Sequence, residues 1–267
     1  MMIIIYLLII LIILMVSYLI FYRKDTFENN RMYNIPKIIY LSYKTKDIPE
    51  YVIKKWNEIY PDYEVKLYDN NDCINFLKKE FNDEYVDIFN YIKDGPIKAD
   101  FWRVCILYKY GGIYSDIDVE PLINIKKIMF SDTTFITCLS AYSKNINPHF
   151  IVSEPRHKVL KMCIDKYLEM YRDKKKYTYS SWSIVYIMKD VLREVFDKYI
   201  IKDGLYYDND KCKYQFMKEV STFPRSIFNL KSLWLRLTNT GRELYCKYNN
   251  IKVLNNKYDS YLDHEFK

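Results

Sequence analysis

The stretch from Ala99 to Pro121 constrains the fold of this chain more than any other part of the sequence. Apolar residues occupy most sides of the segment that follows Pro96, which predicts a buried helix rather than one on the surface. Gly111–Gly112 comes next, and two glycines end a helix where a positive φ and a tight turn are required. Asp116 and Asp118 follow after a very short extended segment. The sequence therefore predicts a helix, a glycine stop, a short strand and two carboxylates in close succession.

Charged residues lie on both sides of the glycine stop. Asp100 and Arg103 are three residues apart in the predicted helix, so their side chains share one face. Opposite charges on a buried helix need partners, which are either each other or a charged ligand. In an extended segment, side chains alternate with period two, so Asp116 and Asp118 are expected to point to the same side. We interpret this stretch as one that presents charge in a cleft.

Paired carboxylates at this spacing allow several chemistries. Two close carboxylates repel each other unless a cation or hydrogen-bond donors compensate. Mn²⁺ and Mg²⁺ bind carboxylate oxygens together with water and substrate phosphates, and a metal held in this way neutralises a diphosphate leaving group. Taken alone, however, Asp116 and Asp118 fit a solvated acidic turn better, because such pairs are frequent in loops.

Other motifs with similar residues were compared with the sequence. A calcium-binding loop is excluded, because Glu120 and Pro121 stand where it needs an oxygen ligand and a glycine. A phosphatase or phosphotransferase with Asp116 as aspartyl nucleophile stays open, although only Ile113–Ser115 precedes the pair as a strand. A serine or cysteine hydrolase is disfavoured, because no nucleophile-elbow pattern accompanies the few histidines. Those histidines are His149, His157 and His264.

The order of predicted elements indicates an α/β domain. A short apolar run at Ile35–Leu41 predicts a buried strand, and Glu50–Tyr60 has helical periodicity. A strand at Tyr63–Tyr68 and two helices within 73–93 follow. Alternating strands and helices are typical of layered α/β folds. Further along, the pattern predicts a strand at Thr133–Ser140, helices at Val159–Arg172 and Trp182–Tyr199, and short strands and loops from Tyr206 onward.

The N-terminal segment predicts a membrane anchor. Met1–Tyr22 is almost wholly apolar and long enough to cross a bilayer as a helix. It lacks a basic start and a small-residue cleavage site, so we interpret it as an uncleaved single-pass anchor that meets the membrane through residues 3–22. Arg23 and Lys24 favour a cytoplasmic position for the rest of the chain, but a lumenal (Golgi- or ER-like) face stays open. A short stem over 23–34 and a catalytic domain over 35–267 complete the predicted organisation.

Composition adds two limits. The formal net charge of +7 suits an anionic substrate or a phosphate-bearing surface, and scattered surface lysines explain it equally well. No basic stripe with motif spacing is present, so a nucleic-acid partner is not predicted. The six cysteines are widely separated and form no Cys-x-x-Cys pair, so a cysteine metal site is not predicted either. Cys105 and Cys138 are expected to be small core residues.

The fixed positions of this stretch together resemble a known signature. They read Ala99-Asp100-x-x-Arg103-x-x-x-Leu107-x-x-x-Gly111-Gly112-Ile113-Tyr114-x-Asp116-x-Asp118. This pattern is similar to that of a DXD-containing retaining glycosyltransferase family, glycosyltransferase family 32, which includes the yeast initiating α-1,6-mannosyltransferase and α-1,4-galactosyl- and N-acetylglucosaminyltransferases. Glucosylating clostridial toxins carry a similar block. The resemblance extends over roughly residues 35–160.

The resemblance implies a fold, a reaction and roles for several residues. The implied fold is GT-A, a Rossmann-like mixed sheet flanked by helices and here preceded by a transmembrane helix. The implied reaction transfers a hexose or N-acetylhexosamine, with retention, from a UDP- or GDP-sugar to a glycan, lipid or protein acceptor. By position, Asp118 and Asp116 would hold Mn²⁺ (or Mg²⁺), and both are also implied as catalytic. Donor-binding roles would fall on Asp100, Arg103, Tyr114, Asp116 and Asn147, with Asp100 and Arg103 also catalytic.

Two points stay open at this level. A helix-internal ion pair is the alternative interpretation of Asp100 and Arg103, and His264 is the candidate for a third metal ligand. A catalytically silent, membrane-tethered binding domain would carry the same pattern, as would the aspartyl phosphotransferase considered above.

Overall fold

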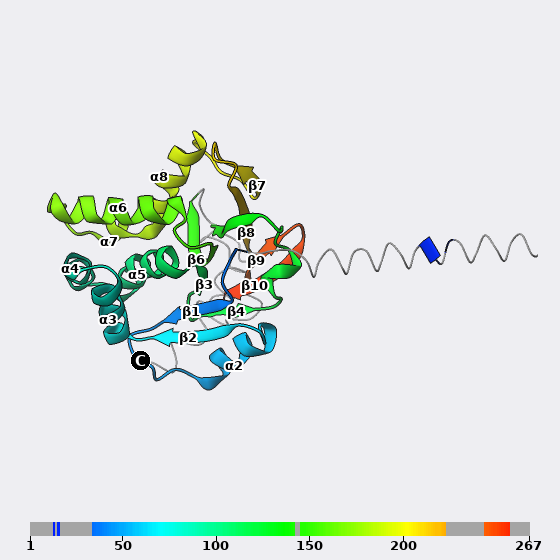
Figure 1. Cartoon of the computed structure of the whole chain (residues 1–267), viewed down its shortest axis with the longest axis horizontal. Coiled ribbons are helices and arrows are strands. Elements are labelled where there is room, and N and C mark those ends of the chain that lie inside the picture. The colour runs from blue at the N-terminus through cyan, green and yellow to red at the C-terminus, as the bar shows by residue number, and fades with distance from the viewer. Residues whose placement is uncertain (1–12, 14, 17–33, 142–144, 223–242, 257–267) are drawn as a thin grey trace, which may run out of the picture. The chain divides into compact units, whose positions relative to one another are not determined.

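Within the residues that the structure describes, ten strands form one mixed sheet with helices packed on it (Figure 1). The structure is a computed structural model, and it describes residues 13, 15–16, 34–141, 145–222 and 243–256. The chain divides into two units, 1–33 and 34–267, and all elements described below belong to the second. Most of the predicted membrane anchor and of the predicted stem lies outside the described residues. Among the described residues, no helix is long and apolar enough to span a bilayer.

The strands follow the order β2-β1-β3-β6-β5-β8-β9-β10-β4, and β7 pairs with β8 at the side. The strand β1 runs parallel to both β2 and β3, whereas β3 and β6 are antiparallel and β5 and β8 are parallel. The α/β class predicted from the element order is therefore confirmed, and the sheet is mixed. The bounds of the strands are β1 Ile38–Ser42, β2 Glu64–Tyr68, β3 Gly112–Ser115, β4 Val119–Pro121, β5 Thr133–Leu139, β6 Ile146–Ser153, β7 Gly204–Tyr207, β8 Lys213–Ser221, β9 Leu244–Tyr248 and β10 Ile251–Asn256.

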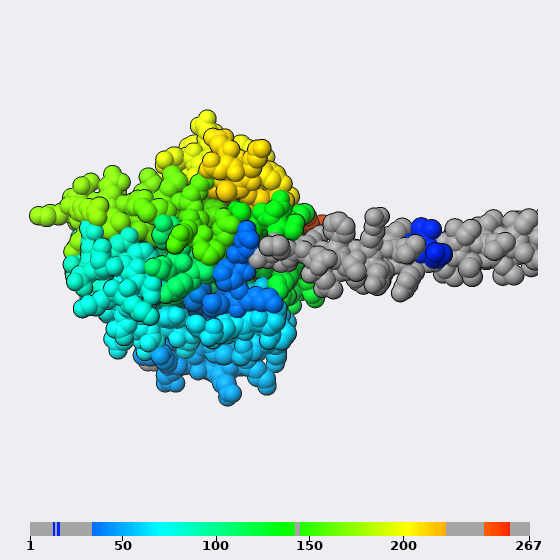
Figure 2. Space-filling view, in the orientation of Figure 1, coloured from blue at the N-terminus to red at the C-terminus, as the bar shows by residue number. Residues whose placement is uncertain are grey.

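Helices cover the sheet from several sides. Figure 1 shows α5 beside α6 and α3, and α2 packs against β2 and β4, the first and last strands of the order. In the space-filling view, α2 and β2 form one end of the surface while α8 and β7 form the other (Figure 2). The bounds are α2 Glu50–Ile59, α3 Asn70–Glu80, α4 Asp83–Tyr91, α5 Gly95–Tyr110, a 3₁₀ turn Ile125–Lys127, α6 Lys158–Arg172, α7 Tyr179–Trp182 and α8 Ile184–Phe196.

The helix α5 is the buried helix that the sequence predicts. Nine of its residues between Ile97 and Leu107 are buried, including the charged Asp100 and Arg103. It ends at Gly111, whose φ is 66°, and a Cβ added there would lie 2.7 Å from Cδ of Pro155. Gly112 has φ 101°, and a Cβ there would lie 2.7 Å from a backbone oxygen of β1. Both glycines are therefore required by conformation and by space.

Three local predictions differ from the structure. Asp116 and Asp118 do not lie in an extended segment but in the turn between β3 and β4, where the Val119 N–H donates to the carbonyl of Asp116 at 3.2 Å. The single helix expected over Trp182–Tyr199 is two helices, because the Ser183 hydroxyl accepts from the N–H of residue 185 and starts α8 anew.

The strand β6 was not predicted as an element, although it lies at the centre of the sheet. Its sequence is Ile-Asn-Pro-His-Phe-Ile-Val-Ser, and the asparagine, proline and histidine hide the strand pattern. Its pairing with β5 is irregular: Thr137 is opposite Ile151, but the next residue, Cys138, is opposite Asn147. The three residues 148–150 therefore form a bulge, and bulges release backbone groups from the ladder and redirect side chains.

Candidate active site

The site forms where α5, β3 and the turn after β3 meet. Arg103 Nη2 lies 2.9 Å from Oδ1 of Asp100 and 3.0 Å from Oδ1 of Asp116. The same guanidinium stacks over the Tyr114 ring, 4.4 Å from its centroid. We call these four residues, with Asp118, the DXD cluster. The helix-internal ion pair that the sequence left open does form, and it extends to the first aspartate of the Asp-x-Asp pair.

Arg103 is held by the backbone as well. Its Nη1 donates to the carbonyl of Pro148 at 2.6 Å, and its Nε donates to the carbonyl of Ala99 at 3.4 Å. The residue is only 4% exposed. Burial alone would lower the pKa of Arg103, but the carboxylates of Asp116 and Asp100 and the ring of Tyr114 raise it above its ordinary value. The guanidinium is therefore a fixed, permanently charged centre of the site.

Asp100 connects this centre to α8. It is 7% exposed, and its Oδ2 accepts the backbone N–H of Ile184 at 3.1 Å. Burial raises the pKa of Asp100 to about 6, against the opposing effect of Arg103. Because Ile184 is the first residue of α8, Asp100 also satisfies one of the N–H groups that a helix leaves unpaired at its start.

Asp116 is oriented by Arg103, Tyr114 and His149. Besides Arg103, the hydroxyl of Tyr114 donates to its Oδ1 at 2.8 Å, and that hydroxyl lies 3.4 Å from Oγ of Ser42. The backbone N–H of Asp116 donates to the carbonyl of His149 at 2.8 Å. The bulge in β6 thus supplies carbonyls to both Arg103 and Asp116, so these two residues are fixed by one strand.

Asp118 differs from Asp116 in its surroundings. Burial and the nearby carboxylate of Asp116 raise its pKa to about 6, and His149 opposes this rise. A carboxylate whose ionised form is disfavoured by a second carboxylate gains most from a bound cation. The oxygen donors of Asp116 and Asp118 are of the type that Mn²⁺ and Mg²⁺ prefer, so the residues present fit such a metal. The candidate third ligand, His264, lies outside the described residues.

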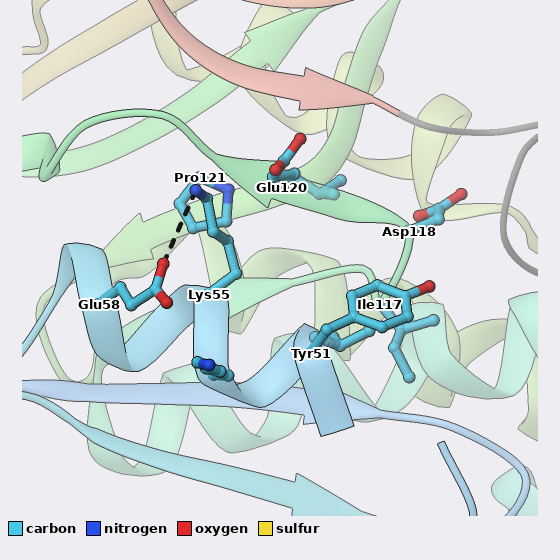
Figure 3. A pocket seen from close by; sticks show the side chains of 10 residues that line it. Tyr51, Lys55, Glu58, Ile117, Asp118, Glu120 and Pro121 are labelled. Carbon is cyan, nitrogen blue, oxygen red and sulfur yellow. Dashed lines mark ion pairs between the residues drawn. The ribbon is translucent and has the colours of Figure 1, made fainter. Parts of the chain in front are cut away.

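Two cavities meet at Ile117 and Asp118. The first, of about 410 Å³, contains Arg103, Tyr114 and Asp116 in its lining, together with residues from β1, α3 and the start of α5. The second, of about 310 Å³, lies between α2 and β4. Figure 3 shows the Tyr51 ring beside Ile117 in this second cavity, with Asp118 at its edge and Lys55 paired with Glu58 at 3.8 Å.

Asn147 lies close to the cluster but contacts other groups. It stands one residue before Pro148, and its side-chain amide donates to Oε1 of Glu219 at 3.1 Å. Its donor-binding role stays a prediction. Sequence reasoning missed the contribution of His149 and Pro148, because both act through backbone carbonyls, and a sequence pattern does not show which carbonyls a bulge releases.

Comparison with known proteins identifies the class. Residues 48–135 match the family described as "Glycosyltransferase sugar-binding region containing DXD motif". These residues cover α5, the glycine stop and the Asp-x-Asp turn, and the recognition predicted from the sequence is thus confirmed. This region of the chain is therefore similar to the sugar-binding region of DXD-type glycosyltransferases.

Individual relatives are similar over part of their length. A mannosyl phosphorylinositol ceramide synthase of Saccharomyces cerevisiae is 36% identical over 38% of this chain and 29% of the relative. The initiation-specific α-1,6-mannosyltransferase of Schizosaccharomyces pombe is 32% identical over 38% and 28%, respectively. The lactosylceramide 4-α-galactosyltransferase of Rattus norvegicus is 32% identical over 28% and 19%. The chain thus spans less than a third of the length of each of these three relatives.

A solved structure, the PaToxG glycosyltransferase, aligns with a TM-score of 0.47 and 17% identity. The alignment covers 60% of this chain and 69% of that chain.

Proposed function

We propose that the chain is a metal-dependent, retaining glycosyltransferase with a GT-A-type catalytic domain. The observation that carries the proposal is the Arg103 guanidinium bonded at once to Asp100 and Asp116, beside a second carboxylate, Asp118, on one cavity. The donor would be a UDP- or GDP-hexose in the larger cavity. The named relatives transfer mannose or galactose, which makes these sugars the first to test.

Asp116 and Asp118 would hold a divalent cation, Mn²⁺ or Mg²⁺, which supplies charge neutralisation to the departing diphosphate. Arg103 has little freedom to turn toward a ligand, because its contacts to Asp100, Asp116, Pro148 and Ala99 engage all three of its nitrogens. Its function in this site is therefore to orient Asp116 and to contribute a fixed positive charge next to the leaving group. Tyr114 completes the orientation of Asp116 through its hydroxyl.

The second cavity offers a place for the acceptor. It shares Ile117 and Asp118 with the donor cavity, so a hydroxyl bound there would stand beside the donor sugar. Two of these relatives have a ceramide lipid in their names. We favour a glycolipid acceptor, because this cavity combines the apolar Tyr51 and Ile117 with charged side chains of both signs that could bind the hydroxyls of a sugar headgroup.

The experiment that tests the function measures nucleotide release from UDP-Glc, UDP-Gal, UDP-GlcNAc and GDP-Man, with and without Mn²⁺. We expect one donor to be turned over in a Mn²⁺-dependent manner, and Asp118→Asn to abolish this turnover. Asp87→Asn, at an exposed position of α4, is the matched control that should retain it. Equal release by Asp118→Asn and wild type would refute the metal role of Asp118.

Two rival functions give different results in the same system. Trapping of a covalent phosphate on Asp116 would favour the aspartyl phosphotransferase. Absence of turnover with every donor, together with Mn²⁺-dependent binding of a nucleotide-sugar, would favour a silent binding domain.

Membrane anchoring through residues 3–22 is part of our proposal. Protease protection of the C-terminus in intact vesicles would distinguish a lumenal from a cytosolic catalytic domain.

A further inference from the structure

A second group of potential metal ligands lies on three strands of the sheet. Cys138 on β5, His149 on β6 and Cys246 on β9 are all buried, and their ligand atoms lie within 4.8 Å of one another. We call these three residues the thiol cluster. The strand order β6-β5-β8-β9 brings them together although the two cysteines are far apart in the sequence. From these residues we infer a zinc-binding site with three protein ligands, separate from the carboxylates of the DXD cluster.

The histidine is oriented as a metal ligand would be. Its Nδ1 lies 2.9 Å from the carbonyl oxygen of Asn147, and a carbonyl only accepts, so Nδ1 carries the proton. The other nitrogen, Nε2, is directed at Sγ of Cys246 at 3.4 Å, and in the neutral ring it carries the lone pair that a metal ion would bind. Zinc-binding histidines commonly donate their second N–H to a backbone carbonyl in this manner, which fixes both the tautomer and the ring.

The distances fit a tetrahedral ion. Zinc binds thiolate sulfur at about 2.3 Å and histidine nitrogen at about 2.0–2.1 Å, so a sulfur and a nitrogen on one tetrahedral ion stand about 3.5 Å apart. The measured separation of 3.4 Å between Cys246 and His149 matches this value. The second sulfur, Sγ of Cys138, lies within 4.8 Å of both of the other ligand atoms.

The charges balance as well. Cys138 and Cys246 are both free thiols in the structure. Binding of Zn²⁺ displaces one proton from each thiol and forms two zinc–sulfur bonds and one zinc–nitrogen bond. Two thiolates then neutralise the two charges of the ion, so the buried site carries no net charge. The fourth position would be taken by water, as three protein ligands leave one open.

The bulge in β6 gives this site a structural consequence. The His149 side chain belongs to the thiol cluster, while its carbonyl accepts the N–H of Asp116 in the DXD cluster. An ion on His149 would therefore fix the strand that positions the first aspartate. The metal would bind as the chain folds, because all three ligands are buried in the folded protein.

Metal analysis of the purified full chain tests this inference. After expression with zinc and dialysis against EDTA, we expect about one zinc per chain by mass spectrometry. Cys138→Ala and Cys246→Ala should reduce this at least tenfold, whereas Cys163→Ala, a buried lone cysteine in α6, should leave it unchanged. Any of three results would overturn the proposal: absence of zinc in the wild type, zinc retained in a variant that carries both the Cys138→Ala and the Cys246→Ala substitutions, or a Cys138–Cys246 disulfide in the native protein.

Cobalt spectroscopy keeps the test valid if a cysteine variant fails to fold. Co²⁺ added to the zinc-free wild type should give the intense thiolate-to-cobalt band of a tetrahedral sulfur site. Asp116→Asn/Asp118→Asn should retain that band, because the DXD cluster offers only oxygen. A weak, octahedral cobalt spectrum that disappears in this double aspartate variant would assign the ion to the DXD cluster and refute the thiol site.

Discussion

The DXD cluster contacts the carbonyls of Pro148 and His149, and the thiol cluster contains the His149 side chain, but the two clusters differ in how their residues come together. The DXD cluster takes all its side chains from 19 consecutive residues, Asp100 to Asp118. The thiol cluster takes one residue from each of three strands, and its ends are 108 positions apart (Cys138 to Cys246). The first is set by a helix, a glycine stop and a turn, whereas the second depends on the register of the whole sheet. The geometry of the DXD cluster can thus be predicted from neighbouring residues in the sequence, whereas that of the thiol cluster cannot.

The two clusters also offer different donor atoms. Carboxylate oxygens in the DXD cluster suit hard divalent cations, while sulfur and imidazole nitrogen in the thiol cluster suit zinc. A change in one cluster should therefore leave the metal of the other in place, although both share β6. Four predictions follow, starting with the largest expected effect, and the first of them tests this separation directly.

Asp118→Asn should reduce nucleotide release from the preferred donor by at least about 100-fold, because an amide does not supply the charge that a divalent cation needs. The fold should be retained, since the pKa of Asp118 is already raised by burial and loss of its charge costs the folded state little. Initial rates at saturating Mn²⁺ measure the effect. Zinc content should stay at the wild-type value; a parallel loss of zinc would show that the two clusters are one site.

Arg103→Lys should lower turnover about 10- to 100-fold, because one ammonium group cannot bond Asp100, Asp116 and the carbonyl of Pro148 together. The free energy of unfolding should fall by about 2–3 kcal/mol, as buried partners lose their bonds. Arg172→Lys is the control, since Arg172 forms a two-point pair with Glu84 at the surface. For Arg172→Lys, urea unfolding should show a change in the free energy of unfolding below about 1 kcal/mol. Equal losses of stability in the two variants would contradict the central role of Arg103.

These two predictions rest on residues that the sequence identified, and the reason is physical. The helix–glycine–strand pattern fixes the order and spacing of Asp100, Arg103, Tyr114 and Asp116, so their meeting follows from local structure. The sequence could not show that Asp116 and Asp118 lie in a turn, because that depends on the pairing of β4 with β10, more than 130 residues away. Nor could it show β6, whose polar residues conceal a buried strand. The thiol cluster was missed for the same reason, since spacing along the chain says nothing about cysteines that meet across strands.

Gly111→Ala should destabilise the fold by about 2 kcal/mol, because alanine at a φ of 66° is strained and its Cβ would meet Pro155. Gly95→Ala is the matched control: it lies at the start of the same helix, with open space for a Cβ. That variant should be neutral or stabilised by up to about 1 kcal/mol. Thermal unfolding of both variants measures the difference. If the Gly111 variant were as stable as the Gly95 variant, the glycine stop would not be the element that fixes the DXD cluster.

His157 provides a comparison with His149, because it is also buried but serves as the N-cap of α6, where its ring accepts the N–H of Val159. Burial lowers the pKa of His157 to about 3. In the unfolded chain its pKa is about 6.5, so between pH 6.5 and 3 the unfolded state binds the extra proton. The folded state, in which the His157 ring stays neutral, is therefore fully stable above pH 6.5. Its free energy of unfolding falls as the pH falls, by about 2 kcal/mol between pH 6.5 and 5.

His157→Asn keeps a cap acceptor without a titrating ring, so its free energy of unfolding should depend less on pH over this range. Urea titrations of both proteins at pH 6.5, 5.75 and 5 would measure the two slopes. Parallel slopes for the variant and the wild type would mean that His157 titrates alike in the folded and unfolded states.

The bulge in β6 also changes how a mutational scan of this protein should be interpreted. The carbonyls of Pro148 and His149 serve the DXD cluster, while the His149 side chain belongs to the thiol cluster, so a substitution in this bulge alters backbone spacing as well as side-chain chemistry. A loss of activity at these positions could be misinterpreted as the loss of a substrate-binding side chain, although its cause is a shifted carbonyl. Amide hydrogen exchange at Asp116, whose N–H is bonded to the His149 carbonyl, would separate the two causes. A residue that touches substrate would leave that amide protected, whereas a displaced strand would expose it to solvent.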